Sequence, residues 1–381
     1  MSLEARIFKS FAEIDPAAWD ACFTGEAEGH AYYAACEEGE GKHIQHGAAA
    51  VFADGRLVAA APIFRIVFRL DTPIQGPLRR LTERVHPLVK GLIDLPIIAF
   101  GSPYSERCHI GFARDLDATT RRRLLLMLMD LLEDHAHRSG IGLVALKDLA
   151  QAEEAEFGAM IAAHGWTRAR SLPTAVLDLP FADFDAYLES LSAATRKDVR
   201  RKLRSRQALR IEWRSDIDGL EDEIAELYAS TRRRSSLDYG DFETLPDGYF
   251  RTVTRALGER ARIAHYWAGD TLCAFNLVLI EKDRMIDKFL GMRYPLGQEH
   301  NVYAVSWMEN VKECLARGIG CLQTGQTAYG LKLRYGSRLQ PSHVYFKHRS
   351  ALPYAILKTV NRFMKADRLD PELRATRAFT S

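Results

Sequence analysis

Two pairs of similar segments recur along this chain in the same order. The segment DGRLVAAAPIF, starting at Asp54, resembles GDTLCAFNLVL, starting at Gly269, and each reads as a turn followed by a buried strand. Further along, RSGIGLVALKD from Arg138 resembles ARGIGCLQTGQ from Ala316, and each reads as a helix end that enters a strand. The shared order predicts that one α/β unit is duplicated. The alternative is that Gly-Ile-Gly is a common helix-to-strand turn.

Hydrophobic periodicity predicts alternating helices and strands in both copies. Some stretches repeat apolar residues at helical spacing, and others alternate around two-residue hairpin turns such as Asp54-Gly55 and Gly269-Asp270. The pair Asp15-Pro16 is a helix start signal. The expected fold class is α/β (α+β), with mixed, mostly antiparallel sheets flanked by helices. Expected strands are 48–64 and 263–280 as hairpins, 141–147, 175–179, 210–213, 285–290 and 319–324, and expected helices include 30–38, 115–138, 153–164, 184–206, 219–232, 248–257 and 351–365.

The pattern restarts near Leu179-Pro180, which sets the expected domain boundary. We predict an N-terminal domain at 1–180, a C-terminal domain at 181–350, and a C-terminal helix and tail at 351–381. The less regular stretch at about 65–102 contains prolines and is read as an insertion. The C-terminal helix is basic and amphipathic, so it either lies on a membrane or closes a core.

Composition excludes several classes of protein. The formal charge of +2 implies no overall nucleic-acid field. The six cysteines show no C-x-x-C pair and no zinc spacing, so we expect reduced packing residues and no metal site. The first residues lack a hydrophobic signal core, and no apolar run is long enough to span a bilayer. We expect a cytoplasmic protein without a transmembrane segment.

The stretch from Met285 to Gly336 is the most informative about function. A buried strand leads through a Pro/Gly turn to a helix that Asn301 is placed to cap and Gly318 to end. A short strand then enters a loop that carries Gln323, Gln326, Tyr329 and Lys332. Such a unit presents backbone N–H groups at a helix N-terminus to an anion.

Three pieces of the second half resemble the GNAT superfamily of acyltransferases, in the branch that contains the Fem-type peptidoglycan aminoacyl transferases. They are LSAATRKDVRRKLR at 191–204, the hairpin, strand and helix of 263–317, and RGIGCLQTGQTAYGLKLRYGSRLQPSHVYF from Arg317. Together they cover about 181–350. The resemblance implies tandem GNAT-like domains, of which the second keeps the site. This sequence departs from the acetyl-CoA-binding members at Arg293-Tyr-Pro-Leu-Gly297-Gln-Glu, because this segment has one glycine and the equivalent segment of those members has more than one.

Acyl transfer to an amine needs a proton acceptor, because a free amine has a pKa of about 10.4. Asp287, in an otherwise apolar strand, is one candidate, and structural pairing with Lys332 or Arg334 is the alternative. Lys332 could neutralise an anionic intermediate, or it is an ordinary surface lysine. Tyr329 could protonate a leaving thiolate, or it packs. Gln323 and Gln326 are expected to bind substrate.

The expected cofactor-binding residues share positive charge or a place in the Pro/Gly turn. They are Arg293, Gly297, Gln298, Asn301, Arg196 and Arg200. The last two belong to a basic helix that could hold coenzyme A phosphates or tRNA, or could simply be solvated. Tyr33 is expected to line the groove between the domains as a substrate-binding residue.

The resulting hypothesis is an N-acyltransferase without a tightly bound cofactor. It would move an acyl group from a coenzyme A thioester or acyl carrier protein to an amine of a small-molecule or cell-envelope precursor. One alternative is an aminoacyl-tRNA-dependent, Fem-like transferase. The other is a non-catalytic binding protein that retains the fold.

Overall fold

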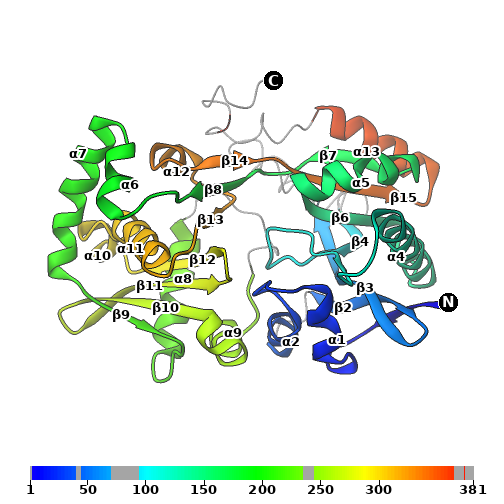
Figure 1. Cartoon of the computed structure of the whole chain (residues 1–381), viewed down its shortest axis with the longest axis horizontal. Coiled ribbons are helices and arrows are strands. Elements are labelled where there is room, and N and C mark those ends of the chain that lie inside the picture. Colours follow the sequence, from blue (N-terminus) through cyan, green and yellow to red (C-terminus); the bar gives the residue numbers. More distant parts are fainter. Residues whose placement is uncertain (1, 40–43, 70–93, 235–243, 364–372, 374–381) are drawn as a thin grey trace.

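Figure 1 shows two halves side by side, each with helices packed around a sheet. The computed structural model describes residues 2–39, 44–69, 94–234, 244–363 and 373. Its first half contains β1 (Leu3–Phe8), α1 (Pro16–Cys22), α2 (His30–Glu38), β2 (Gln45–Ala53), β3 (Arg56–Arg69), β4 (Asp94–Phe100), β5 (Gly111–Phe112), α4 (Ala118–Arg138), β6 (Leu143–Ala150), α5 (Gln151–Ala163) and β7 (Thr167–Arg170).

The second half repeats the same succession of elements. It contains β8 (Thr174–Asp178), α6 (Phe184–Ser190), α7 (Ala193–Lys202), the 3₁₀ turn η2 (Leu203–Ala208), β9 (Arg210–Arg214), α8 (Glu221–Arg234), α9 (Tyr249–Leu257), β10 (Ala261–Ala268), β11 (Thr271–Ile280), β12 (Arg284–Met292), α10 (Leu296–Glu299), α11 (Val302–Ala316), β13 (Cys321–Gly325), α12 (Tyr329–Arg334), β14 (Arg338–Gln340), β15 (Ser342–His348) and α13 (Ala351–Phe363).

The two sheets have equivalent strand orders. One runs β1-β2-β3-β4-β6-β15-β7, with β5 beside β3, and the other runs β9-β10-β11-β12-β13-β8-β14. Pairing is antiparallel except between β4 and β6 and between β12 and β13. The repeated segments of the sequence occupy equivalent places, with β3 matching β11 and β6 matching β13. The mixed, mostly antiparallel, duplicated architecture is therefore confirmed.

The halves exchange one strand each. Strand β8 follows the first copy but lies between β13 and β14, and β15 follows the second copy but lies between β6 and β7. In Figure 1 these strands run in opposite directions across the top of the molecule. The predicted domain limits at 1–180 and 181–350 remain a proposal, and the strand pairing crosses them.

Equivalent helices meet between the halves. Helix α2 follows β1 and α9 follows β9, and the two helices pack against each other at the lower centre of Figure 1. The hydroxyls of Tyr32 and Tyr249 lie 2.9 Å apart in this contact, and both side chains are buried. Apolar residues of both halves belong to one core there. Burial of this shared core holds the two copies together.

Local signals specify many of these elements. The Asp15 carboxylate accepts a hydrogen bond from the Ala18 N–H at 2.9 Å and so caps α1, with Pro16 in its first turn. The β2–β3 hairpin turns through Asp54 and Gly55, whose φ angles of 48° and 83° are those of a two-residue type I′ turn. These two predictions from sequence are confirmed.

Some predicted boundaries were wrong. Residues 65–69 continue β3 and 94–100 form β4 inside the sheet, so the insertion predicted at about 65–102 is too wide, and its middle part, 70–93, lies outside the described residues. The helix predicted at 184–206 breaks, because Leu191 is extended and Ser192 caps α7. Beyond α13, only residue 373 of the predicted tail is described.

Candidate functional site

Strands β12 and β13 run parallel and pair only at their beginnings. Their Cα partners are Arg284 with Cys321, Met285 with Leu322, and Ile286 with Gln323. From Asp287 onward, β12 continues to pair with β11 alone. Pairing between the two parallel strands therefore stops one residue before the predicted base.

Asp287 is a partly buried carboxylate with a perturbed pKa. The Asn276 amide on β11 donates a hydrogen bond of 2.6 Å to its Oδ1. Burial raises the pKa of Asp287 to about 6, even though the Asn276 hydrogen bond and the charge of Lys332 act in the opposite direction. A carboxylate with this pKa is ionised at neutral pH and can still take up a proton. It is therefore suited to general base chemistry.

Lys332 lies beside this carboxylate. It is only 4% exposed, so it is not the surface lysine of the alternative interpretation. Its ammonium donates a hydrogen bond to the carbonyl of Thr324, which directly follows the last β13 residue that pairs with β12. The predicted loop is in fact helix α12, which Tyr329 begins and which carries Lys332 one turn further on. The fold thus brings the predicted base and the predicted lysine together.

The hydroxyl of Tyr329 does not support the role of an acid. The side chain is fully buried, and its O–H donates to the Pro173 carbonyl at 2.9 Å. A proton engaged in this way anchors α12 to the residue before β8. We interpret Tyr329 as a residue that positions α12.

The first half contributes a carboxylate to this region. Glu106 accepts hydrogen bonds from the Gln323 side chain at 3.1 Å and from the Gln326 N–H at 3.2 Å. Its negative charge also raises the pKa of Asp287. The Gln326 side chain donates to the Leu172 carbonyl at 2.9 Å, so its amide N–H already has a protein partner. Both predicted glutamines therefore contact Glu106, Gln323 through its side-chain amide and Gln326 through its backbone N–H.

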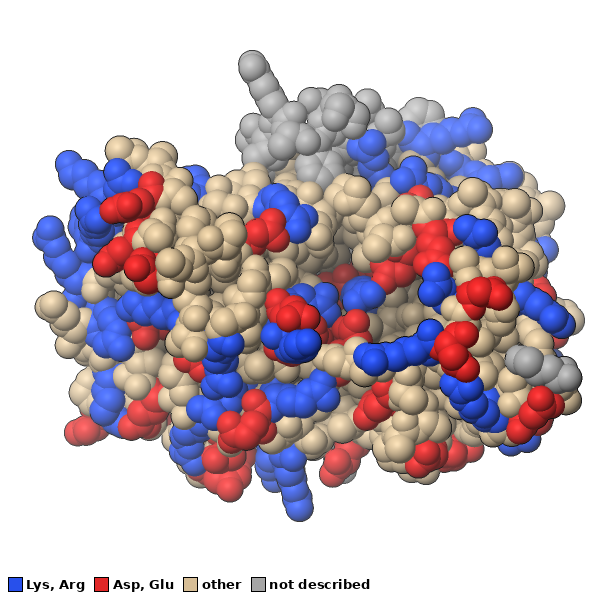
Figure 2. Space-filling model, viewed as in Figure 1, with Lys and Arg blue, Asp and Glu red and all other residues tan. Residues whose placement is uncertain are grey.

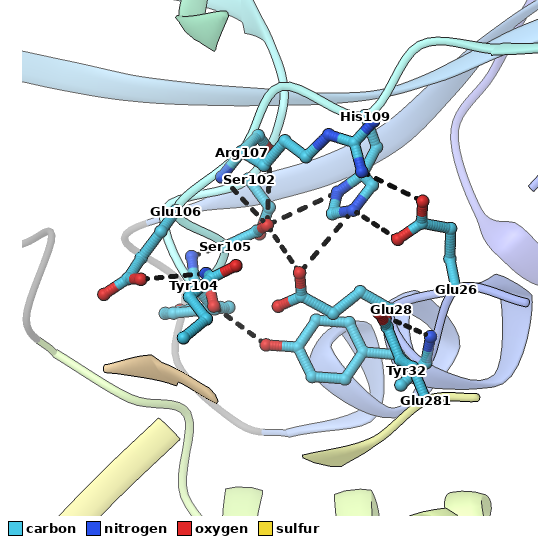
Figure 3. A network of polar contacts seen from close by, with 12 residues as sticks. Glu26, Glu28, Tyr32, Ser102, Tyr104, Ser105, Glu106, Arg107, His109 and Glu281 are labelled. Carbon is cyan, nitrogen blue, oxygen red and sulfur yellow. Dashed lines mark hydrogen bonds and ion pairs between the residues drawn. The ribbon is translucent and has the colours of Figure 1, made fainter. Parts of the chain in front are cut away.

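That network of contacts continues into the first half, and Figure 3 shows part of it. Arg284 donates to Gln323 at 3.3 Å and to Glu26 at 2.9 Å. Lys288, the residue after Asp287, forms an ion pair of 2.6 Å with Glu28, and their side chains are only 5% and 3% exposed. Burial opposes ionisation of Glu28, but the charges of Lys288 and His109 outweigh it, so the pKa of Glu28 lies below its ordinary value.

The molecular surface between the halves is also rich in charged side chains. Figure 2 shows side chains of both charge signs around a hollow in the middle of the face, between the two halves. Charged groups that are held by partners of opposite sign keep fixed positions. The region between the halves is therefore a polar, preorganised surface.

In the turn predicted to bind a cofactor, the backbone N–H groups donate hydrogen bonds to carbonyls of the turn itself. Residues 296–299 form α10, in which the Gly297 N–H donates to Arg293 O at 2.7 Å and the Gln298 N–H to Pro295 O at 2.9 Å. The Asn301 N–H donates to Gln298 O at 3.0 Å. These groups are not available to wrap a pyrophosphate, so the prediction of an anion-binding turn is not supported in this conformation.

The other predicted cofactor residues divide into two kinds. The Asn301 side chain does not cap α11 but donates to Ser205 at 2.9 Å, which ties η2 to the start of α11. Arg196 donates to the carbonyls of Glu189 and Leu191 and so closes the end of α6. Arg200 is exposed on α7 and is free to contact an anion at the surface.

Tyr33 does not line a groove. It is 1% exposed, stacks on Phe11, and its hydroxyl lies 2.7 Å from Nδ1 of His109. A residue in this position cannot touch a substrate directly. It can hold the imidazole of His109.

The sequence analysis did not identify several polar residues of the site. Asn276 and Asn310 are fully buried, and neither the Oδ1 of Asn276 nor either amide atom of Asn310 has a hydrogen-bond partner among the described residues. Asn310 also lowers the pKa of Asp287, although no hydrogen bond of normal geometry joins them. The sequence did contain a signal for Asn276, because this residue is the polar member of the apolar run LCAFNLVLI. Glu106 offered none, because its partner is 217 residues away.

A protein-family comparison finds a similarity in the second half. Residues 193–333 match the model described as "Acetyltransferase (GNAT) domain". A search of curated proteins gave no match. Within the described residues, no helix is long and apolar enough to cross a membrane, and no group of three or more His, Cys, Asp or Glu side chains could hold a metal ion.

Solved structures share the whole fold. One is FemX, with a TM-score of 0.58 and 13% identity, covering 95% of this chain and 100% of that one. Another is the C-terminal domain of a putative lysylphosphatidylglycerol synthetase from Agrobacterium fabrum, with a TM-score of 0.53 and 12% identity over 92% and 97%. A third is a tandem GNAT protein from the clavulanic acid biosynthesis pathway, with a TM-score of 0.52 and 12% identity over 92% and 99%. At these identities the likeness concerns the fold alone.

Proposed function

We propose that this protein, which has the tandem GNAT/Fem-like fold, is an N-acyltransferase whose reaction takes place where β12 and β13 separate. The observation that carries the proposal is Asp287, whose pKa burial raises to about 6. It lies beside the buried ammonium of Lys332 and next to the last paired residues of two parallel strands. Carboxylates perturbed in this way concentrate at functional sites.

In the proposed reaction Asp287 removes a proton from the ammonium form of the acceptor. The amine nitrogen then attacks the carbonyl carbon of the donor, so a C–N bond forms and the bond from carbon to the leaving group breaks. In this proposal Lys332 offsets the negative charge that develops, and the Asn310 amide, which has no hydrogen-bond partner among the described residues, donates to it. The nitrogen loses a second proton to water as the amide forms, and the leaving group takes up the proton that Asp287 returns. No covalent enzyme intermediate is needed.

An acyl thioester is the donor we favour. The matched GNAT domain and the tandem architecture support an activated acyl group. Because the N–H groups of α10 are engaged, the phosphates of the donor would be held by side chains, with exposed Arg200 and Arg293 as candidates. A carrier-bound thioester, which does not depend on a pyrophosphate-binding turn, suits this arrangement as well as coenzyme A does.

The test supplies isotope-labelled acetyl-coenzyme A, a long-chain acyl-coenzyme A or an acyl carrier protein together with a small-molecule extract. Mass spectrometry then follows the label into amides. Wild-type protein should form a labelled amide with at least one donor, and the Asp287→Asn variant should not. If no donor of the three yields an amide, or if the variant forms the product at the wild-type rate, the proposal is wrong.

A second candidate is aminoacyl transfer from tRNA. It is favoured by the exposed Lys197, Arg200 and Arg204, which have no ion-pair partner among the described residues. Incubation with tRNA carrying radioactive amino acids distinguishes the two donors. This candidate predicts amide formation that ribonuclease abolishes, and tRNA binding that weakens steeply with salt. Activity that survives ribonuclease would rule it out.

A further inference from the structure

A row of polar side chains lies on the sheet face that α11 covers. Its members are Tyr266 on β10, Asn276 on β11 and Asp287 on β12. The Cα partners of Tyr266 and Asp287 on β11 are the residues two before and two after Asn276. Because side chains two residues apart on a strand share a face, the three side chains form a diagonal row across the sheet. Tyr266 packs in one apolar cluster with Val302 and Val305, which places the row beneath α11.

Several polar atoms along this row have no hydrogen-bond partner among the described residues. They are the hydroxyl of Tyr266, the Oδ1 of Asn276 and both amide atoms of Asn310. Asn310 belongs to α11 and acts on the Asp287 carboxylate from there. The side chains of Tyr266, Asn276 and Asn310 are fully buried. Buried polar groups are nearly always hydrogen-bonded, so this group of atoms needs an occupant that can bond to them.

Ordered water fits the bonding needs of these atoms. The Nδ2 of Asn276 donates to Asp287 at 2.6 Å, which leaves its Oδ1 as an acceptor. In the proposed reaction the Nδ2 of Asn310 donates to the developing charge, which leaves its Oδ1 as a second acceptor. Burial raises the pKa of Tyr266 well above its ordinary value, so its hydroxyl keeps the proton and can both donate and accept. A buried water makes about three hydrogen bonds to protein groups, and these three groups supply them.

The row has a second end close to the molecular surface. The charges of both Glu309 on α11 and Asp287 raise the pKa of Tyr266, so its hydroxyl lies within range of both carboxylates. Glu309 pairs with Arg206 at 3.0 Å and with Lys312 at 2.8 Å. The side chains of these two cations are 42% and 38% exposed, so they reach solvent. The polar row therefore runs from the proposed base to the surface beside Glu309.

The proposed reaction releases one proton in each turnover. An ammonium group and an acyl thioester give an amide and a thiol, so two protons leave the nitrogen. Asp287 carries one of them to the leaving group. The other is left over and has to travel from a buried site to solvent.

We propose that ordered water held by Asn276, Asn310 and Tyr266 conducts this second proton from the amine to the solvent beside Glu309, an inference that rests on the function proposed above. The water nearest Asp287 accepts the proton from nitrogen. Each group along the chain then gains one proton from the inner side and gives up one to the outer side. The Tyr266 hydroxyl breaks one O–H bond as it forms another, so it is unchanged after each turnover. It acts through water and is therefore a positioning residue.

A high-resolution crystal structure of the full chain tests for the water without any need for catalysis. At least one ordered water should lie about 2.7–3.2 Å from the Tyr266 hydroxyl and from the Oδ1 of Asn276 or Asn310. The Tyr266→Phe variant keeps the ring and should keep the fold, but this water should be lost or displaced in it. A wild-type structure without water between these atoms overturns the proposal.

Kinetics in light and heavy water test the proton route. Tyr266→Phe should lower kcat at least about tenfold, leave KM unchanged and increase the solvent deuterium isotope effect, because proton release then limits turnover. Tyr335→Phe is the matched control. Tyr335 is also fully buried with an unpartnered hydroxyl among the described residues, but it lies within range of the charge of Asp198 on α7. This control should keep the wild-type rate and isotope effect.

The outcomes separate this proposal from the function on which it rests. If the wild type forms no amide with any donor, the proposed function is wrong and the proton route falls with it. If the wild type is active and Tyr266→Phe matches its kcat and isotope effect, only the proton route is overturned. Equal slowing of Tyr266→Phe and Tyr335→Phe would also overturn the route, because the loss of any buried hydroxyl would then have the same effect.

Discussion

The Glu106 carboxylate accepts a hydrogen bond from the Gln323 side chain at 3.1 Å, although the two residues lie 217 positions apart. One belongs to the loop after β4 and the other to β13, so the contact joins the two copies of the repeated unit. Gly325 allows it, because the Oε1 atom of Glu106 occupies the space that a Cβ at this position would take. The candidate site is thus completed by a residue from the other half.

We expect Asp287→Asn to abolish the proposed base while preserving the fold. Turnover should fall by about 10²- to 10⁴-fold, the usual contribution of a general base. Steady-state kinetics measure this effect. Asp283→Asn is the matched control, because Asp283 is exposed in the turn just before β12. Equal rates for the wild type and Asp287→Asn would mean that another group accepts the proton.

The same substitution should also increase stability at alkaline pH. Burial raises the pKa of Asp287 from 3.8 to about 6, so its contribution to folding is favourable below pH 3.8 and is lost as the pH rises through 6. At pH 8 the neutral amide avoids a cost of up to about 3 kcal/mol, at about 1.4 kcal/mol for each pKa unit. Denaturant unfolding at pH 8 and pH 5 should show the larger gain at pH 8. A loss of stability at pH 8 would instead indicate a structural ion pair.

Lys332→Met should change the pH dependence of the reaction. The ammonium lowers the pKa of Asp287, so its removal raises that pKa. The acidic limb of the kcat/KM profile, expected near pH 6 in the wild type, should therefore move to higher pH while the maximal rate falls. Methionine keeps most of the buried volume.

Lys282→Met is the control for this variant, because Lys282 is exposed before β12 and is absent from the groups that shift the pKa of Asp287. Its profile should match that of the wild type. An unchanged acidic limb in Lys332→Met would show that the lysine does not act on the titrating group.

Gly325→Ala should displace Glu106. Gly325 has a φ of +85°, and an added Cβ would lie 2.5 Å from Oε1 of Glu106. Gly318→Ala is a close control, because its φ is +69° and nothing lies within 4 Å of the new Cβ. Both variants carry the cost of a left-handed alanine, about 1–2 kcal/mol. Only Gly325→Ala should also reduce kcat/KM, and an equal reduction in both would argue against a role for Glu106.

Lys288→Met should destabilise the junction between the halves. It removes one partner of a buried ion pair with Glu28, and the remaining uncompensated charge costs about 3–5 kcal/mol. Equilibrium unfolding measures the loss. Adding Glu28→Gln to this variant should recover part of the lost stability, because a neutral amide then replaces the unpaired Glu28 carboxylate. A double variant as unstable as the sum of the two single variants would show that the pair is not coupled.

Local interactions explain what the sequence by itself determined. The helix start at Asp15, the Asp54-Gly55 hairpin and the two pairs of repeated segments depend on groups a few residues apart, so they could be read directly. Asp287 and Lys332 were also found, because an acidic residue in an apolar strand is conspicuous. The structure brings the two side chains near each other, an arrangement that structural pairing would also produce, and their catalytic roles remain predictions.

Only the tertiary structure decided which groups meet across the chain. The exchange of β8 and β15, the approach of Glu106 to Gln323, and the position of Tyr33 behind His109 each join residues distant in sequence. Periodicity cannot encode them, since many strand pairings bury similar apolar surface and the choice depends on packing of the whole molecule. The turn at 293–301 is a further example of a feature that the sequence could not determine. Its motif predicted N–H groups available to an anion, whereas in the structure these groups form the internal hydrogen bonds of α10 and its flanks.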